Sequence, residues 1–291
     1  MTENFCNDLL MVFNNYIEKS KVIINTKEQP EKNSQAKYEL QNETYKDHVA
    51  SAIAMGVVLR EVAADNLMGI QRVLTEPIMT FAPFVLYRNL IEMSAMSIWF
   101  LSTGIHEVER TKRILTYRNE ALKEELKYSH SINDQELAAK VSERIQKLQE
   151  KAVAISIDPK RNIKNEILGY GIVMPSRTEV IKDSLGDESV YRLFSAVSHG
   201  QLWAIIQSSF RKNSSDIYIF ENVKGGVLEK NISPLSLIYL CFFSIEYVTK
   251  AEIEQFKLFG WDERPLMQLD LEIKMNLEQI SQAYKIELDQ Y

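Results

Sequence analysis

The sequence has few of the residues that interrupt regular structure, with ten glycines and seven prolines among 291 positions. So small a number favours long helices over a turn-rich all-β fold. Cysteine is scarcer still, and Cys6 and Cys241 each stand alone in an apolar, helix-like context. Isolated cysteines of this kind predict buried thiols in a reducing compartment, and neither a disulfide framework nor a thiolate metal site.

The sequence also lacks an excess of positive charge, since its net charge is −6. Proteins that coat nucleic acid or bind polyphosphate are usually basic, because neutralising phosphate charge supplies most of their non-specific affinity. Any contact with nucleic acid is therefore expected to be local.

Unbroken apolar runs of membrane-spanning length are missing as well. Residues 78–101 are interrupted by Pro83 and two charged side chains, and residues 234–248 are too short. Both segments are predicted to be core helices. The first residues lack the basic region and apolar core of a signal peptide. We therefore expect a cytoplasmic protein that does not enter a membrane.

The sequence motifs that usually bind metal or phosphate do not occur. The four histidines lie far apart, and none belongs to a His-Glu-x-x-His, Cys-x-x-Cys or Glu-x-x-His arrangement. Gly169-x-Gly171 lacks the third glycine and the lysine of a phosphate-binding loop, and there is no Gly-x-Ser-x-Gly nucleophile motif. We expect neither a metal ion nor a cofactor.

Apolar residues recur at helical spacing along most of the chain, and strands do not alternate with helices as they do around a parallel sheet. The pattern predicts an all-α, multi-helix bundle that forms a single domain over residues 1–291. Its expected parts are an N-terminal helix (3–24), a mobile loop (25–37), a helical core (43–103 and 176–286) and a charged helical hairpin (107–154). A small β-hairpin is predicted near 217–228, with its turn at Gly225-Gly226.

The charged hairpin at 107–154 has two interpretations. Its first helix holds the only concentration of basic residues, with glutamates interleaved at i,i+4 spacing, which is typical of a solvated helix face. Alternatively, the two polar helices project from the core and pack on a partner protein.

Two charged residues occur inside the apolar segment 81–101. Arg88 and Glu92 are spaced i,i+4, so they share one helix face. One interpretation is a buried ion pair that locks two helices together. The other is that these side chains line a cavity shared with Arg192 and His199.

The strongest candidate for chemistry is the segment 191–203. Arg192 and His199 are seven residues apart in an apolar, helix-like stretch, so both side chains project from one face. An arginine can hold a phosphate and stabilise the charge of a pentacoordinate transition state. A histidine can take a proton from a ribose 2′-hydroxyl or give one to the leaving oxygen. Together they suffice for RNA cleavage without a metal, with Ser195 and Ser198 near the same face.

An arginine followed by six residues and a histidine on a late helix of an all-α protein resembles the HEPN superfamily. The wider phrase 191–200 and the upstream Tyr87-Arg88-Asn89-Leu90-Ile91-Glu92 are similar to uncharacterised bacterial helical proteins of that kind. The resemblance covers about residues 55–256. It implies a HEPN-like core, a metal-independent endoribonuclease of a toxin or anti-phage defence system, and a homodimer whose two sites form one composite cleft.

In this interpretation Arg192 binds the scissile phosphate and His199 does the acid–base work. The expected supporting residues are Tyr191, Ser195, Ser198, Arg88 and Glu92.

Two alternatives belong to other classes of protein. In the first, the chain is a non-catalytic interaction module of a defence or regulatory system. Arg192 then pairs with Glu92 or Glu246, and His199 is a satisfied core histidine. In the second, a small molecule binds an aromatic pocket made by Trp99, Trp203, Tyr87 and Phe84.

Overall fold

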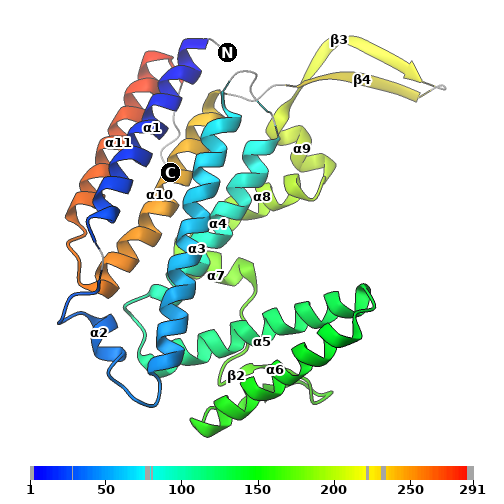
Figure 1. The fold of residues 1–291 in the computed structure, drawn as a ribbon. Helices are drawn as coiled ribbons and strands as arrows, with labels where there is room; N and C mark the ends of the chain where they lie inside the picture. Colours follow the sequence, from blue (N-terminus) through cyan, green and yellow to red (C-terminus); the bar gives the residue numbers. More distant parts are fainter. Residues whose placement is uncertain are drawn as a thin grey trace.

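The computed structural model describes residues 3–27, 29–75, 79, 81–220, 223–230 and 234–286, and for residues within 206–230 it describes the backbone alone. The described residues form an all-α bundle of eleven helices with two small β-hairpins, which confirms the predicted fold class (Figure 1). Among the described residues, no helix is long and apolar enough to cross a membrane. The helices are α1 (Glu3–Asn25), α2 (Gln35–Glu39), α3 (Lys46–Val73), α4 (Ala82–Leu101), α5 (Glu107–Ser131), α6 (Gln135–Ala154), α7 (Arg177–Leu185), α8 (Glu188–Ser198), α9 (Leu202–Ser209), α10 (Pro234–Phe259) and α11 (Arg264–Ala283).

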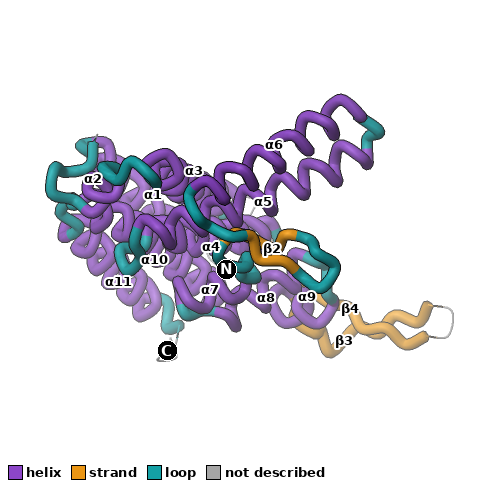
Figure 2. The backbone as a smooth tube through the Cα atoms, turned by 90° about the horizontal axis from the view of Figure 1, so that it is seen from below, coloured by secondary structure: helices purple, strands orange, loops and turns teal. Residues whose placement is uncertain are grey.

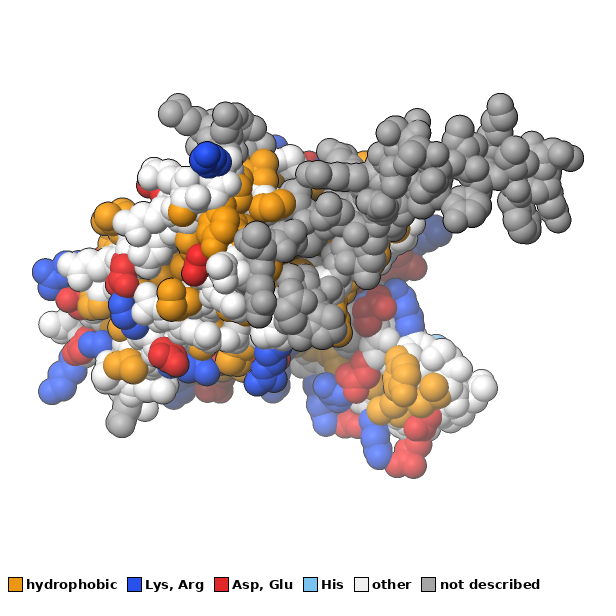
Figure 3. Space-filling model, turned by 90° about the horizontal axis from the view of Figure 1, so that it is seen from above, with side chains coloured by type: hydrophobic (Ala, Val, Ile, Leu, Met, Phe, Trp, Pro, Cys, Tyr) orange, Lys and Arg blue, Asp and Glu red, His pale blue; other side chains and the backbone are white. Residues whose placement is uncertain are grey.

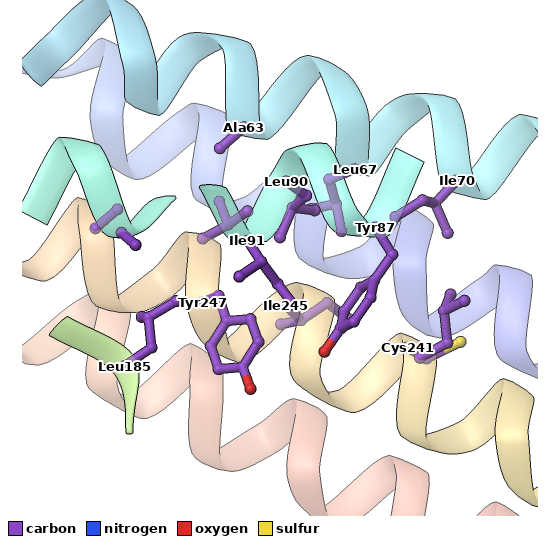
Figure 4. Close-up of a cluster of buried hydrophobic side chains, with 14 of the residues drawn as sticks. Ala63, Leu67, Ile70, Tyr87, Leu90, Ile91, Leu185, Cys241, Ile245 and Tyr247 are labelled. Atoms are coloured by element: carbon purple, nitrogen blue, oxygen red, sulfur yellow. The ribbon is translucent and has the colours of Figure 1, made fainter. Parts of the chain in front are cut away.

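Helix α4 lies at the centre of the bundle, between α3, α10, α7 and α8. Its sequence is apolar on nearly every face because it has neighbours on nearly every side. Figure 4 shows how side chains from these helices fill the space between them. The labelled core residues are Ala63, Leu67 and Ile70 of α3, Tyr87, Leu90 and Ile91 of α4, Leu185 of α7, and Cys241, Ile245 and Tyr247 of α10.

Helices α1 and α11 form an outer layer on α10, on the side of the bundle away from α8 (Figures 1 and 2). Helix α1 corresponds to the predicted N-terminal helix, and its side chains Phe5, Leu9 and Phe13 are buried. Cys6 lies in the same core cluster as Cys241, and both are buried as predicted. Burial raises the pKa of the Cys241 thiol well above its usual range, which keeps it protonated and unreactive.

The stretch predicted as a mobile loop over residues 25–37 contains the start of a helix. Ser34 caps α2 by accepting a hydrogen bond from the Lys37 amide, and Ala36 is fully buried. The α2 residue Glu39 is also buried and pairs with Arg110 of α5. A five-residue helix is not stable by propensity, so these tertiary contacts hold it in place.

Helices α5 and α6 form the predicted hairpin, which projects from the bundle (Figures 1 and 2). Their inner faces share a small core of their own, to which Tyr170 contributes. Figure 3 shows the hairpin as a separate lobe covered by charged side chains of both signs, with apolar side chains among them. The interpretation as a solvated face is wrong for Arg110, which is fully buried and donates to Glu39 Oε2 over 2.7 Å from its Nε.

Both hairpins of strands are antiparallel. Strands β1 (Pro159–Arg161) and β2 (Ile167–Tyr170) lie in the connection between α6 and α7. Strands β3 (Phe210–Phe220) and β4 (Val223–Lys230) form the predicted hairpin near 217–228. The turn predicted at Gly225-Gly226 is wrong, because these glycines pair with Tyr218 and Ile217 inside the ladder.

Candidate functional site

The helix-like stretch 191–203 is divided between two helices, α8 and α9, and the break decides where His199 lies. Helix α8 ends in a Schellman motif: the Gln201 amide donates to the Ala196 carbonyl at 2.9 Å, and Gly200 donates to Val197 at 3.0 Å. Gly200 adopts the left-handed conformation that this motif requires, with φ +69°. His199 is therefore the C-cap of α8, and α9 starts in a new direction at Leu202.

Helix α8 packs on α4, and this contact brings three of the predicted site residues together. Arg88 and Glu92 form an ion pair within α4, with 2.8 Å between Nη2 and Oε1. Tyr191 of α8 donates its hydroxyl to the same Glu92 oxygen over 2.8 Å. The Arg88 guanidinium lies over the Tyr191 ring, 5.9 Å from its centroid. The predicted ion pair of Arg88 and Glu92 is present, but it is partly exposed and lies within one helix, and the Tyr191 hydroxyl connects it to α8.

The electrostatics of this α4–α8 cluster are those of a closed network. Burial and the bond to Glu92 raise the pKa of Tyr191, so its hydroxyl stays protonated and keeps donating. Glu92 offsets the charge of Arg88, which would be costly to leave alone at a mostly buried position. The Nε of Arg88 is buried and has no acceptor among the described residues. The cluster can hold α8 against α4, but its one carboxylate is already engaged twice.

Arg192 lies outside this cluster, on the exposed side of α8. Its side chain is 65% exposed and pairs with Glu188, one turn earlier, at 2.6 Å from Nη2 to Oε1. The pairing expected in the alternative interpretation, with Glu92 or Glu246, is wrong: Glu92 is taken by Arg88, and Glu246 pairs with Lys250 at 2.8 Å.

His199 is exposed at the end of α8 and is therefore not a satisfied core histidine. Its amide still donates to the Ser195 carbonyl at 3.0 Å, so the backbone follows the helical path up to this residue. Seven helical steps place Arg192 and His199 about 10 Å apart along the axis and on one face. Both side chains are thus exposed to solvent on the same side of α8.

Ser195 and Ser198 of α8 lie outside the α4–α8 cluster. Ser198 donates its hydroxyl to the Phe194 carbonyl at 2.9 Å, an i−4 bond that uses its only proton. Ser195 is half-buried on α8 between Tyr191 and His199. Neither residue takes part in the Arg88–Glu92–Tyr191 contacts.

The four aromatic residues do not form the pocket considered above. Phe84 and Tyr87 are buried, and both pack against Phe194 of α8, with ring centroids 5.2 Å and 4.8 Å away. Trp99 lies under the Arg113 guanidinium at 5.0 Å. Trp203 is exposed on α9 and donates to Gln201. Phe84 and Tyr87 thus share one contact with Phe194, whereas Trp99 and Trp203 each lie in a different contact.

A buried polar cluster that the sequence did not predict links α1 to α10. Tyr16 donates its hydroxyl to Glu252 at 3.0 Å, and Thr249 lies 2.9 Å from the same hydroxyl. Burial raises the pKa of Glu252 to about 7 and that of Tyr16 well above its usual range. The only sequence signal was a polar residue at a core position of each helix. Among the described residues, no group of three or more His, Cys, Asp and Glu side chains could hold a metal ion.

Comparison with known proteins adds no relative, since no family model, curated protein or solved structure matches the chain.

Proposed function

We propose that the protein is a HEPN-like, metal-independent endoribonuclease in which Arg192 binds the scissile phosphate and His199 acts as acid and base. The single observation that carries the proposal is the joint exposure of these two side chains on one side of α8. A core role would have buried them, as it buries Arg110.

The ion pair with Glu188 is compatible with phosphate binding by Arg192. Exposed i,i+4 pairs contribute only about 0.3–0.5 kcal/mol, so a phosphate can replace the carboxylate. The guanidinium also has five N–H donors, of which the pair with Glu188 uses those on Nε and Nη2. Local binding of this kind suits an acidic chain.

The proposed reaction needs only these two side chains. His199 takes the proton from a ribose 2′-hydroxyl, and the 2′-oxygen forms a bond to phosphorus. Arg192 stabilises the additional negative charge of the pentacoordinate phosphorus. The bond to the 5′-oxygen then breaks, and the imidazolium returns its proton to that oxygen. The products are a 2′,3′-cyclic phosphate and a free 5′-hydroxyl.

In this proposal the α4–α8 cluster is support and takes no part in the proton transfers. Tyr191 and Glu92 fix α8 against α4 and so fix the direction in which Arg192 and His199 project. A cytoplasmic location, a role in defence or toxicity, and assembly as a homodimer belong to the same proposal.

The test is cleavage of single-stranded RNA in the presence of a metal chelator. His199→Ala should lower the rate by about 10²–10⁴-fold, the usual contribution of a general acid–base group. Arg192→Ala should lower it by a similar factor, because charge stabilisation is lost. Glu188→Gln should leave the rate equal or higher, because it frees Arg192.

The matched controls replace an exposed histidine and an exposed arginine elsewhere. His106→Ala and Arg144→Ala should leave the rate unchanged, and Arg144 has a surface carboxylate partner, Glu125, just as Arg192 has Glu188. Equal cleavage by wild type and a folded His199→Ala variant in matched preparations would sink the proposal.

The hairpin α5–α6 favours the second candidate, an interaction module. Its free end lies away from the bundle (Figure 1). The apolar side chains of Tyr128 and Ile132 are exposed there. If this end binds a partner protein, Tyr128→Glu with Ile132→Glu should abolish co-purification of that partner, and His199→Ala should not. If the protein is the proposed endoribonuclease, the variant with Tyr128→Glu and Ile132→Glu should still cleave RNA.

A further inference from the structure

The outward face of α11 carries a row of apolar side chains. Met267, Leu271 and Met275 are 54%, 60% and 53% exposed. They recur every four residues and so form one ridge along the helix. The opposite face of α11 is already buried, through Leu266, Leu269, Ile273 and Leu277. A surface helix is normally polar on its outward face, so the second apolar face marks a contact with another molecule.

The charged residues around this ridge identify the partner. Leu271 is the midpoint between Met267 and Met275, and it is also the midpoint between Arg264 and Glu278. At 100° per residue, all five side chains lie within an arc of about 80°. A two-fold axis at Leu271 therefore places each Met267 opposite a Met275, and each Arg264 opposite a Glu278.

We propose that α11 is a docking surface for a second copy of this chain, packed antiparallel across a two-fold axis at Leu271. Such an interface is self-complementary, as two-fold symmetry requires. A parallel pairing would oppose Arg264 to Arg264 and Glu278 to Glu278, which like-charge repulsion disfavours. The i±4 ridges of the two helices would interdigitate, the commonest class of helix packing.

The two charged residues are available for this contact. Arg264 is an exposed side chain whose Nε and Nη2 donate to Asp262 at 2.7 Å and 2.8 Å. Its Nη1 donors remain for Glu278 of the second copy. Glu278 is exposed, and it has no ion pair with any residue in the described part of the chain.

The neighbouring helix α1 broadens the surface. Two shallow hollows lie where α11 meets α1, on either side of the Lys19–Glu272 ion pair. The exposed side chains of Val22 and Met11 line one hollow each. Methionine is flexible enough to fill irregular hollows of this kind. A stable interface buries about 800 Å² per partner, so contacts from both helices are needed.

This pairing has a consequence for the candidate site. Helix α11 lies on the side of the bundle away from α8, with α10 and α4 between them (Figure 1). The two α8 ends of the dimer would point away from each other. Each Arg192–His199 pair would then act alone, in contrast to the composite cleft that the family resemblance implies.

The first experiment measures the mass of the chain in solution by light scattering and sedimentation. The wild type should be a dimer at micromolar concentration. Leu271→Glu should raise the dimer dissociation constant by about 100-fold or more, because it opposes two carboxylates at the centre of the contact. Val58→Glu, a matched change on the exposed face of α3, should leave the dimer intact. Circular dichroism would establish that both variants are folded.

The second experiment tests the axis by cross-linking. Facing Cα atoms of two packed helices come within about 5 Å, which a disulfide can span. Leu271→Cys should form disulfide-linked dimers under mild oxidation, and the buried Cys6 and Cys241 should not interfere. Met275→Cys alone should not cross-link, but a mixture with Met267→Cys chains should.

A monomeric wild type, or a dimer that Leu271→Glu leaves intact, overturns the proposal. A dimer that cross-links through Leu202→Cys of α9 and not through Leu271→Cys overturns it as well, and supports pairing through the α8–α9 end. None of these three results tests RNA cleavage by His199, which is measured separately.

Discussion

The buried carboxyl group of Glu252 should make the stability of the protein depend on pH. Glu252 is 2% exposed, and burial raises its pKa to about 7, although Arg60 and the Tyr16 hydroxyl partly oppose the shift. A glutamate in the unfolded chain has a pKa of about 4.3. The folded protein therefore binds one more proton than the unfolded chain between these two values, and the neutral carboxyl group favours folding there.

The magnitude follows from the difference between the two pKa values. Each pKa unit corresponds to about 1.4 kcal/mol, so the free energy of unfolding should fall by about 3 kcal/mol between pH 4.5 and pH 7 because of this group. The contribution is fully present below the unfolded value and is lost as the pH rises through 7. The nearby carboxylate of Glu61 raises the pKa of Glu252 further, and the Glu61 side chain is mostly exposed.

The assay compares urea unfolding of wild type and Glu252→Gln at pH 5, 6, 7 and 8. Glutamine cannot ionise but can still accept the Tyr16 hydrogen bond. The stability of the variant relative to wild type should rise by about 2–3 kcal/mol between pH 5 and pH 8. Glu61→Gln is the control, and it should change the pH dependence of the free energy of unfolding much less than Glu252→Gln does. A stability difference between wild type and Glu252→Gln that stays constant from pH 5 to pH 8 would refute the reasoning.

Two further predictions concern α5 and α8. Arg110→Met should lower the free energy of unfolding by about 3–5 kcal/mol, because it leaves Glu39 buried without its partner. The double change with Glu39→Gln should cost less, and thermal unfolding of Arg110→Met and of the double variant measures this directly. An equal or larger loss in the double variant contradicts a paired role. Gly200→Ala should lower the free energy of unfolding by about 1–2 kcal/mol, because alanine is strained in the left-handed conformation of this residue. A Cβ at this position meets open space, so steric contact adds nothing to that cost. A neutral effect of Gly200→Ala on the melting temperature would show that the end of α8 does not depend on this conformation.

Local contacts were within reach of the sequence. The pair Arg88–Glu92 was predicted from its i,i+4 spacing and is present. The partner of Arg192 followed the same rule, since Glu188 is one turn earlier, but more distant glutamates were considered instead. The end of α8 was also encoded locally by His199-Gly200, because glycine is the residue that most readily closes a helix in the left-handed conformation.

Contacts between distant segments could not be read from spacing. Glu39 and Arg110 are 71 positions apart, and Tyr16 and Glu252 are 236 apart. Arg110 occurs in a helix rich in charged residues, so its pattern indicated a solvated face. Only the docking of α2 against α5 shows that this arginine is buried.

The sequence by itself determined the all-α class, most helix positions and the projecting hairpin, because helical periodicity and chain breaks act over a few neighbouring residues. The tertiary structure alone decided which charged side chains are enclosed and which remain exposed. Burial depends on what packs against a helix face, and that is set by residues far away in the chain. Tertiary packing brought Tyr191 to Glu92, enclosed Glu252, and left Arg192 and His199 exposed to solvent.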